Sequence, residues 1–187
     1  ELVLTKPLIT MPLCFWNDHQ NIKYKSSYFS KFKNIWTHGD WVTETKKGGF
    51  IVHGRSDSTL NRSGVRIGSS EIYSAVQTID RVEDSLIIHI DQQKDILILY
   101  IKSLQKISKN YLISVIRDKC SPRHVPDLIY SVPDIPYTLS GKKVELPIKK
   151  ILMGEDSSKV ISKDSLRNPE SIKWYENFYE NFFKISF

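Results

Sequence analysis

The stretch WTHGDWVTETKKGGFIVHGRSDSTLNRSGVRIGSSEI (36–72) decides the fold. Strand-forming residues flank Lys46-Lys47-Gly48-Gly49, and this turn chemistry predicts a β-hairpin over residues 41–54. The Gly/Arg-rich loop that follows leads to Ser69-Ser70-Glu71, where a capping hydroxyl and an acid in the first turn indicate the start of a helix. The stretch therefore passes, near residue 57, from a β-rich segment into a unit with both helix and strand patterns.

The unit after this point has helix and strand patterns in a clear order. We expect a helix from residue 69, strands at 85–90 and 96–101, a helix near 112–120, a strand at 127–132 and a helix at 144–152. Pro147 predicts that the last helix is regular only from about its own position onward. The order of elements predicts an α+β fold.

The two ends of the chain have less regular patterns. Residues 1–9 look like a strand, and an aromatic-rich loop follows them. The chain opens at Glu1 with no Met and no leader, so we expect a fragment. Residues 154–168 are polar and are expected to be a linker, and Asn168-Pro169 starts a tail helix with an apolar stripe. The expected parts are residues 1–57, 58–153 and 154–187.

Composition indicates an ordinary globular chain. It has 187 residues, of which 40% are hydrophobic and 26% charged. No window approaches the roughly 18–20 apolar residues that would span a bilayer. The net charge of +6 is spread over small lysine clusters and forms no stripe, so it indicates tolerance of anionic ligands and gives no reason to expect nucleic acid.

Cys14 and Cys120 have no CxxC spacing and no histidine at ligand spacing. We therefore expect neither a disulfide framework nor a metal site, and a reducing, cytosolic compartment fits. The Asn61-Arg62-Ser63 sequon is read as chance because no secretion signal accompanies it.

Two residues of the opening stretch could hold a ribose. Asp40 follows Gly39, and a carboxylate in such a loop can accept two hydrogen bonds from a cis-diol. Arg55 offers a planar fork for a sugar hydroxyl or a phosphate. Taken alone, Gly-Asp is usually a turn and an arginine at a strand end is usually a solvated charge.

Two further loops could approach an anion. Gly64 and Gly68 flank Arg66 in a loop that leads into a helix N-terminus, although a tight loop with a helix cap explains this equally well. Lys142 ends the segment Thr138-Leu139-Ser140-Gly141-Lys142, a turn that can present an ammonium group to a phosphate but that alone is more often a solvated loop.

The order and spacing of these segments resemble the adenylate-forming superfamily, which includes the acyl-CoA synthetases. Its hallmarks are a Gly-Asp loop, a Gly-Arg-x-Asp hinge before a Gly-x-Arg loop and a Glu-Ile helix, and a late Pro-x-Thr-x-x-Gly-Lys. Within the superfamily the chain is most similar to the acetoacetyl-CoA synthetase branch, through FWND (15–18), YFSKF (28–32), GRSDSTLN (54–61), GVRIGSSEIY (64–73), SPRHVP (121–126) and IPYTLSGKKVE (135–145). Thr37-His38 departs from the commoner superfamily pattern and leaves the contribution of His38 open.

The resemblance implies an ATP-dependent ligase in lipid and ketone-body metabolism. A carboxylate, acetoacetate in this branch, attacks the α-phosphate of ATP, and the thiol of coenzyme A then displaces AMP. Asp40, Arg55 and Arg66 would hold the nucleotide, and Lys142 would be the catalytic cation of the first step. Residues 1–57 would be the end of a large β-rich adenylation domain, and the rest would be a small mobile domain.

The resemblance also assigns roles in the second step. Asp57 would be the hinge about which the small domain turns, and the Ser63-Gly64 loop would then lie beside the pantetheine. Arg117 is a candidate for a coenzyme A phosphate, with a plain helix-surface arginine as the alternative. ATP and Mg²⁺ would be bound mainly by an upstream domain that this chain does not include, so the fragment alone is expected to be inactive.

Two alternatives stay open. An acetyl- or propionyl-CoA synthetase would share nearly every site residue, and the acyl pocket that separates these enzymes lies upstream. A truncated, non-catalytic binding module is the other. The expected partners are small-molecule substrates, with no nucleic acid and no membrane span, and the sequence leaves the oligomeric state open.

Overall fold

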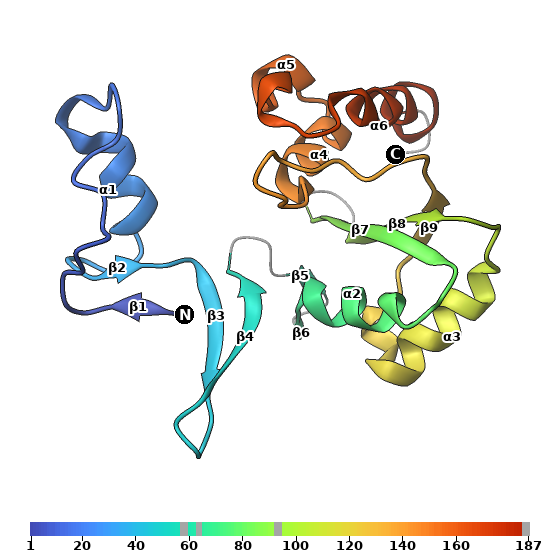
Figure 1. The fold of residues 1–187 in the computed structure, drawn as a ribbon, viewed down its shortest axis with the longest axis horizontal. Helices are drawn as coiled ribbons and strands as arrows, with labels where there is room; N and C mark the ends of the chain where they lie inside the picture. Colours follow the sequence, from blue (N-terminus) through green and yellow to red (C-terminus); the bar gives the residue numbers. More distant parts are fainter. Residues whose placement is uncertain (57–59, 63–64, 92–94, 185–187) are drawn as a thin grey trace. The chain divides into compact units, whose positions relative to one another are not determined.

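A computed structural model describes residues 1–56, 60–62, 65–91 and 95–184. The chain divides into two compact units, residues 1–59 and 60–187 (Figure 1), and each is described by itself. The expected boundaries at 57 and 153 stay predictions, and Asp57 lies outside the described residues. In the described part of the chain, no helix is both long and apolar enough to cross a membrane.

The β-hairpin of the first unit is confirmed. Strand β3 (Asp40–Glu44) pairs antiparallel with β4 (Phe50–Arg55), with an irregularity between Trp41 and Val42. The turn is closed by a 2.8 Å hydrogen bond from the Thr45 N–H to the Gly49 carbonyl, and Gly48 adopts φ +77°, a left-handed conformation that glycine tolerates best. The turn chemistry thus sets the register from the turn to the Val42–Val52 pair, and the irregularity then shifts it by one residue.

The remainder of the first unit differs from the expectation. Strand β1 covers only Val3–Leu4 and pairs with β2 (Trp36–Thr37), so the expected strand over 1–9 was too long. Part of the expected aromatic loop is helical: the 3₁₀ turn η1 (His19–Asn21) leads into helix α1 (Ile22–Tyr28).

Two contacts explain the helix that the sequence pattern did not indicate. The Asp18 carboxylate accepts hydrogen bonds from the N–H groups of Lys23 and Tyr24, at 2.9 and 2.8 Å, and so satisfies donors that a helix start leaves unpaired. Tyr28, at the other end of α1, stacks on Trp36 with ring centroids 3.7 Å apart. An aromatic contact with a distant strand therefore stabilises a short helix.

The second unit is built on a three-stranded sheet. Strand β7 (Val82–Ile90) pairs antiparallel with β8 (Ile96–Ser103), and β8 pairs parallel with β9 (Leu128–Ser131). A separate two-stranded ribbon, β5 (Leu60–Arg62) and β6 (Val65–Ile67), precedes the sheet in the sequence. The three expected strands of the α+β unit are confirmed.

Helices cover both faces of this sheet (Figure 1). Helices α2 (Ser69–Gln77) and α3 (Lys109–Lys119) lie on one face, and α4 (Glu145–Leu152) and α6 (Ile172–Phe178) lie on the other. The shorter elements are α5 (Ser157–Val160), η2 (Pro122–His124), η3 (Lys163–Ser165), η4 (Pro169–Ser171) and the π-helical turn η5 (Tyr179–Phe183).

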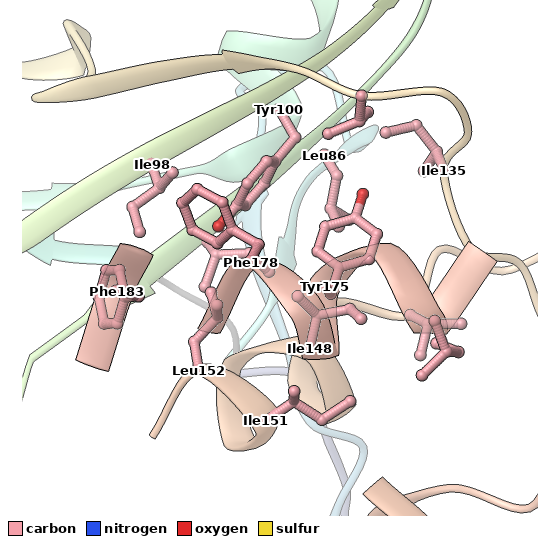
Figure 2. Packing of buried hydrophobic residues seen from close by; sticks show 14 of the residues in the cluster. Leu86, Ile98, Tyr100, Ile135, Ile148, Ile151, Leu152, Tyr175, Phe178 and Phe183 are labelled. Atoms are coloured by element: carbon pink, nitrogen blue, oxygen red, sulfur yellow. The ribbon is translucent and has the colours of Figure 1, made fainter. Parts of the chain in front are cut away.

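Strand alternation divides the core into two clusters. Leu86, Ile98 and Tyr100 point to the α4/α6 face, whereas Ile87 and Leu99 point to the α2/α3 face. Figure 2 shows side chains of α4 and α6 converging on the first of these faces. Both faces are apolar because both are covered by helices.

Three local expectations need correction. The segment 154–168 is not a plain linker, because it contains α5 and the buried Leu166. The N-cap of α2 is Gly68, and no side chain caps it. Helix α4 begins at Glu145, two residues before Pro147, because a proline in the first turn needs no intrahelical N–H.

Candidate functional site

Asp40 and Arg55 face each other at the open end of the β3–β4 hairpin. They are direct cross-strand partners, and an Arg55 guanidinium nitrogen lies 3.9 Å from a carboxylate oxygen of Asp40. The side chain of Asp40 is 17% exposed and that of Arg55 is 53% exposed. The hairpin thus presents a carboxylate and a guanidinium side by side, which suits the hydroxyl groups of a sugar.

Gly39 allows the guanidinium to lie against the backbone. Its φ is +90°, and a Cβ atom built on it would lie 2.8 Å from Nη2 of Arg55. Arg55 also donates a 3.2 Å hydrogen bond to the His38 carbonyl, and the Ser56 N–H donates to the Gly39 carbonyl at 2.7 Å. Any side chain at position 39 would displace Arg55.

His38 and Glu1 orient this pair. The sequence left the contribution of His38 open and gave no indication of Glu1. Nδ1 of His38 hydrogen-bonds the Asp40 carboxylate. The Glu1 side chain, only 5% exposed, accepts 3.1 Å hydrogen bonds from the Gly39 N–H and the Ser56 hydroxyl. A glutamate 38 residues from the loop that it stabilises leaves no local signal.

The surroundings of Glu1 favour its charged form. Partial burial acts to raise the pKa of Glu1, but hydrogen bonds from Lys31 and Ser56 outweigh it and hold that pKa below its ordinary value. A carboxylate that stays ionised keeps accepting hydrogen bonds from the Gly39 loop.

Lys142 lies on a closed turn of the second unit. The Thr138 N–H donates to the Lys142 carbonyl at 2.9 Å, and the Lys142 N–H donates to the Thr138 hydroxyl at 3.0 Å. A third hydrogen bond, 2.9 Å, joins the Gly141 N–H to the Thr138 carbonyl. Lys142 itself is exposed, so its ammonium group can reach a ligand in solvent.

The neighbouring lysine has a different environment. Lys143 is half-buried, donates to the Asp84 carboxylate at 2.7 Å and lies 4.2 Å from the ring centroid of Tyr73. Tyr137, the bridge partner of Lys143, donates its hydroxyl to the other Asp84 oxygen at 2.7 Å. Burial and the Asp84 carboxylate raise the pKa of Tyr137, so this hydroxyl stays a donor.

The remaining expected site residues are less defined. Arg117 is exposed in the last turn of α3. Arg66 lies in β6 opposite Asn61. Ser63 and Gly64 fall outside the described residues, as does Asp57. The structure therefore brings Asp40 and Arg55 together in one unit and places Lys142 and Arg117 in the other.

The SPRHVP motif forms a structural network that sequence reasoning had not assigned. The Ser121 hydroxyl lies 2.8 Å from Nδ1 of His124, and Nε2 of His124 lies 2.5 Å from the Glu71 carboxylate at the start of α2. Arg62 of β5 hydrogen-bonds the Val125 carbonyl and the Asp127 carboxylate. These bonds tie the β5 strand and α2 to the segment after α3.

The described residues contain no group of three or more His, Cys, Asp or Glu side chains that could hold a metal ion. Both cysteines are free: Cys14 is exposed and Cys120 is half-buried.

Comparison with known proteins finds close relatives over nearly the whole chain. It is 41% identical over 186 residues to the acetoacetyl-coenzyme A synthetase of Rhizobium meliloti and 43% identical over 189 residues to the acetoacetyl-CoA synthetase of Gallus gallus. Each match covers 96% of this chain but 28% of the relative. The chain therefore spans little more than a quarter of the length of the relatives it matches. No protein-family model matches it.

Solved structures agree with these relatives. The acetoacetyl-CoA synthetase of Streptomyces lividans superposes with a TM-score of 0.87 at 38% identity, covering 95% of this chain and 28% of that protein. The O-succinylbenzoate coenzyme A synthetase of Bacillus subtilis, in complex with AMP, superposes with a TM-score of 0.60 at 16% identity, over 71% of this chain and 27% of that protein. The second likeness establishes a shared fold only.

Proposed function

We propose that this chain, a homologue of acetoacetyl-CoA synthetases, is part of an ATP-dependent ligase that joins acetoacetate to coenzyme A. The observation that carries the proposal is the turn of residues 137–143. In this turn Lys142 is exposed, while the neighbouring Lys143 forms an ion pair with Asp84. The facing pair of Asp40 and Arg55 supports it as a nucleotide-handling element.

In the proposed first step a carboxylate oxygen of acetoacetate attacks the α-phosphorus of ATP. The bond from that phosphorus to the bridging oxygen breaks, and pyrophosphate leaves. Negative charge develops on the phosphoryl oxygens in the transition state, and a positioned cation stabilises it most where water is excluded. Lys142 is the residue that we assign to this role.

Asp40 and Arg55 are assigned to the ribose of the nucleotide. The Asp40 carboxylate would accept hydrogen bonds from the two ribose hydroxyls, while Arg55 would donate to a hydroxyl oxygen or a phosphate. The bonds from His38 to Asp40 and from Arg55 to the His38 carbonyl support this role, because they hold both side chains before the ligand arrives.

In the proposed second step the sulfur of coenzyme A attacks the acyl carbon, the thiol proton is lost and AMP leaves. We assign Arg66 to the nucleotide and Ser63, Gly64 and Arg117 to coenzyme A, with Asp57 as the hinge between the steps. The exposure of Arg117 is compatible with a phosphate contact and equally with an ordinary surface arginine. By the same resemblance, Mg²⁺ would be held mainly by an upstream domain.

A chimera tests this function. Residues 1–187 replace the homologous segment of the Rhizobium meliloti relative, whose upstream part supplies the acyl pocket, and pyrophosphate release is followed with acetoacetate. Acid preference is measured on the chain joined to its own upstream sequence, with acetoacetate, acetate, propionate and butyrate, and there we expect acetoacetate to be preferred. Lys142→Ala should lower adenylation by roughly 10²–10³-fold and spare thioester formation from a supplied acyl-adenylate, because the cation acts on the phosphoryl oxygens.

Other outcomes would redirect the proposal. An equal loss in both half-reactions would remove the assigned role of Lys142. In the protein with its own upstream sequence, a preference for acetate or propionate would move the chain to the acetyl- or propionyl-CoA ligases. No release from the chimera would favour a binding module. The proposed compartment is the cytosol, which fits the two free cysteines. Cell fractionation with an antibody to the chain checks it.

A further inference from the structure

Asp84 fastens both ends of the turn that carries Lys142. Its Oδ2 accepts a 2.7 Å hydrogen bond from the Tyr137 hydroxyl, and its Oδ1 accepts a 2.7 Å hydrogen bond from Nζ of Lys143. Tyr137 and Lys143 are bridge partners at the base of the turn. One carboxylate on strand β7, more than 50 residues away in the sequence, thus holds the residues that enter and leave the turn.

Lys143 is fixed by more than this ion pair. Its Nζ also donates to the Ser85 carbonyl and lies over the ring of Tyr73. The Tyr73 hydroxyl in turn donates to the Glu145 carboxylate at 2.5 Å and accepts from the Ile87 N–H at 3.1 Å. The side chains of Asp84 and Lys143 are 20% and 18% exposed, so solvent competes weakly for their bond.

The turn is also joined to the C-terminal segment of the chain. The Leu139 N–H donates to the Ser165 carbonyl and the Arg167 N–H donates to the Tyr137 carbonyl, both at 2.9 Å. These bonds hold the backbone, whereas the Asp84 contacts hold side chains. Within the turn, Lys142 is left with its side chain exposed.

We propose that Asp84 is a positioning residue for the adenylation step, because it fixes the Tyr137–Lys143 base of the turn and so the place from which Lys142 reaches the phosphate. This inference rests on the proposed function and adds to it a residue outside the motifs. Asp84 does not touch the nucleotide in this scheme. It acts through the turn, and a displacement of about 1 Å in a catalytic group can lower a rate roughly 100-fold.

Limited trypsin digestion of the 187-residue chain tests the contact directly. Trypsin cleaves after Lys142 and Lys143. When the turn opens and closes faster than trypsin cuts, the rate of cleavage is proportional to the fraction of molecules in which the turn is open. Asp84→Asn replaces an oxygen with an amide that cannot accept from both donors, and Tyr137→Phe removes one donor. We expect both variants to speed cleavage at these sites by roughly tenfold, with cleavage after the exposed Lys119 unchanged.

A matched control is available at the other end of the same strand. Asp91 follows β7 and binds Lys149 of helix α4 at 2.7 Å. Like Asp84, it is an aspartate at one end of β7 that pairs with a lysine, but this lysine lies after the Lys142 turn and outside it. Asp91→Asn removes an ion pair of the same length, at an aspartate that is 53% exposed, without touching residues 137–143. We expect it to leave cleavage after Lys142 and Lys143 unchanged.

The catalytic consequence is measured in the chimera. We expect Asp84→Asn to lower kcat of ATP–pyrophosphate exchange by roughly 10- to 100-fold with little change in the KM for ATP, and to spare thioester formation from a supplied acyl-adenylate. Asp91→Asn should leave both half-reactions at the unsubstituted level. A general loss of stability would lower both half-reactions, so a loss of adenylation with normal thioester formation would indicate a positioning role.

The outcomes separate this inference from the function beneath it. Unchanged cleavage and unchanged exchange in Asp84→Asn would overturn the role of Asp84, and so would equal loss of both half-reactions with accelerated cleavage after Lys119. Normal adenylation in Lys142→Ala would overturn the proposed role of Lys142, and with it the catalytic part of the inference. A chimera without exchange would count against the proposed function, while the digestion would still decide whether Asp84 fixes the turn.

Discussion

At the scale of single residues, the clearest constraint lies at Gly39. Its backbone conformation, φ +90°, is one that side chains rarely adopt, and the space where a Cβ would lie is taken by the Arg55 guanidinium. The glycine of a Gly-Asp pair is therefore more than a turn residue here. It lets an arginine lie beside the carboxylate of Asp40.

Gly39→Ala should weaken nucleotide binding. A methyl group at this position would push Arg55 away from Asp40, and we expect the KM for ATP in the chimera to rise about tenfold, roughly the loss of one hydrogen bond to a charged group. Gly48→Ala is the matched control: its φ is +77°, but no atom lies within 4 Å of the added Cβ.

Both alanine variants should lose about 1–2 kcal/mol of stability, because both force a left-handed conformation on a residue with a Cβ. Only Gly39→Ala should change the KM. An equal change of KM in the two variants would mean that backbone strain, and not the position of Arg55, limits binding.

At the scale of single elements, helix α4 shows how an amphipathic pattern sets packing. Ile148, Ile151 and Leu152 are buried against the sheet, whereas Leu146 in the same helix is 53% exposed. Figure 2 shows Ile148 and Leu152 beside the residues that α6 contributes. The helix directly follows the Lys142 turn, so its burial holds the C-terminal end of that turn in place.

Ile148→Ala should destabilise the protein by about 2–5 kcal/mol, the usual range when a fully buried isoleucine leaves a cavity. Leu146→Ala, in the same helix, should change stability by less than about 0.5–1 kcal/mol because its side chain is already largely in solvent. Urea unfolding followed by circular dichroism measures both. Similar losses for the two variants would contradict the assigned buried face.

At the scale of the whole molecule, the two units differ in how much core they have. Both hydrophobic clusters consist of residues between Leu60 and Phe183. In the first unit, Trp36 is the one buried hydrophobic residue that the described part contains, and Ile9, Leu13 and Trp16 are more than 90% exposed. The chain also spans 28% of its relatives' length, so residues 1–59 are expected to need further partners to bury these side chains.

Residues 60–187 expressed alone should fold, because both clusters lie within them, whereas residues 1–59 alone should not, because so small a unit without a core cannot offset its conformational entropy. Thermal unfolding and dispersed amide NMR spectra measure this. A sharp transition from residues 1–59, or none from residues 60–187, would contradict the prediction.

The sequence by itself determined much of this protein. The turn chemistry of the hairpin, the continuous apolar runs in β7 and β8 and the helical spacing in α2 and α4 are local patterns, so the α+β order could be predicted from them. The motif order pointed to the relatives and to Asp40 and Arg55 as candidate ribose ligands, but the register shift between Trp41 and Val42 makes these two residues direct cross-strand partners.

Only the tertiary structure decided the rest. Helix α1 depends on Asp18 and Trp36, Glu1 holds the Gly39 loop, and Asp84 holds Lys143 from 59 residues away. The two lysines of Gly-Lys-Lys look alike in sequence, yet one is exposed and the other is bound. Such contacts join residues whose separation no periodic pattern encodes, because packing of the sheet against its helices brings them together.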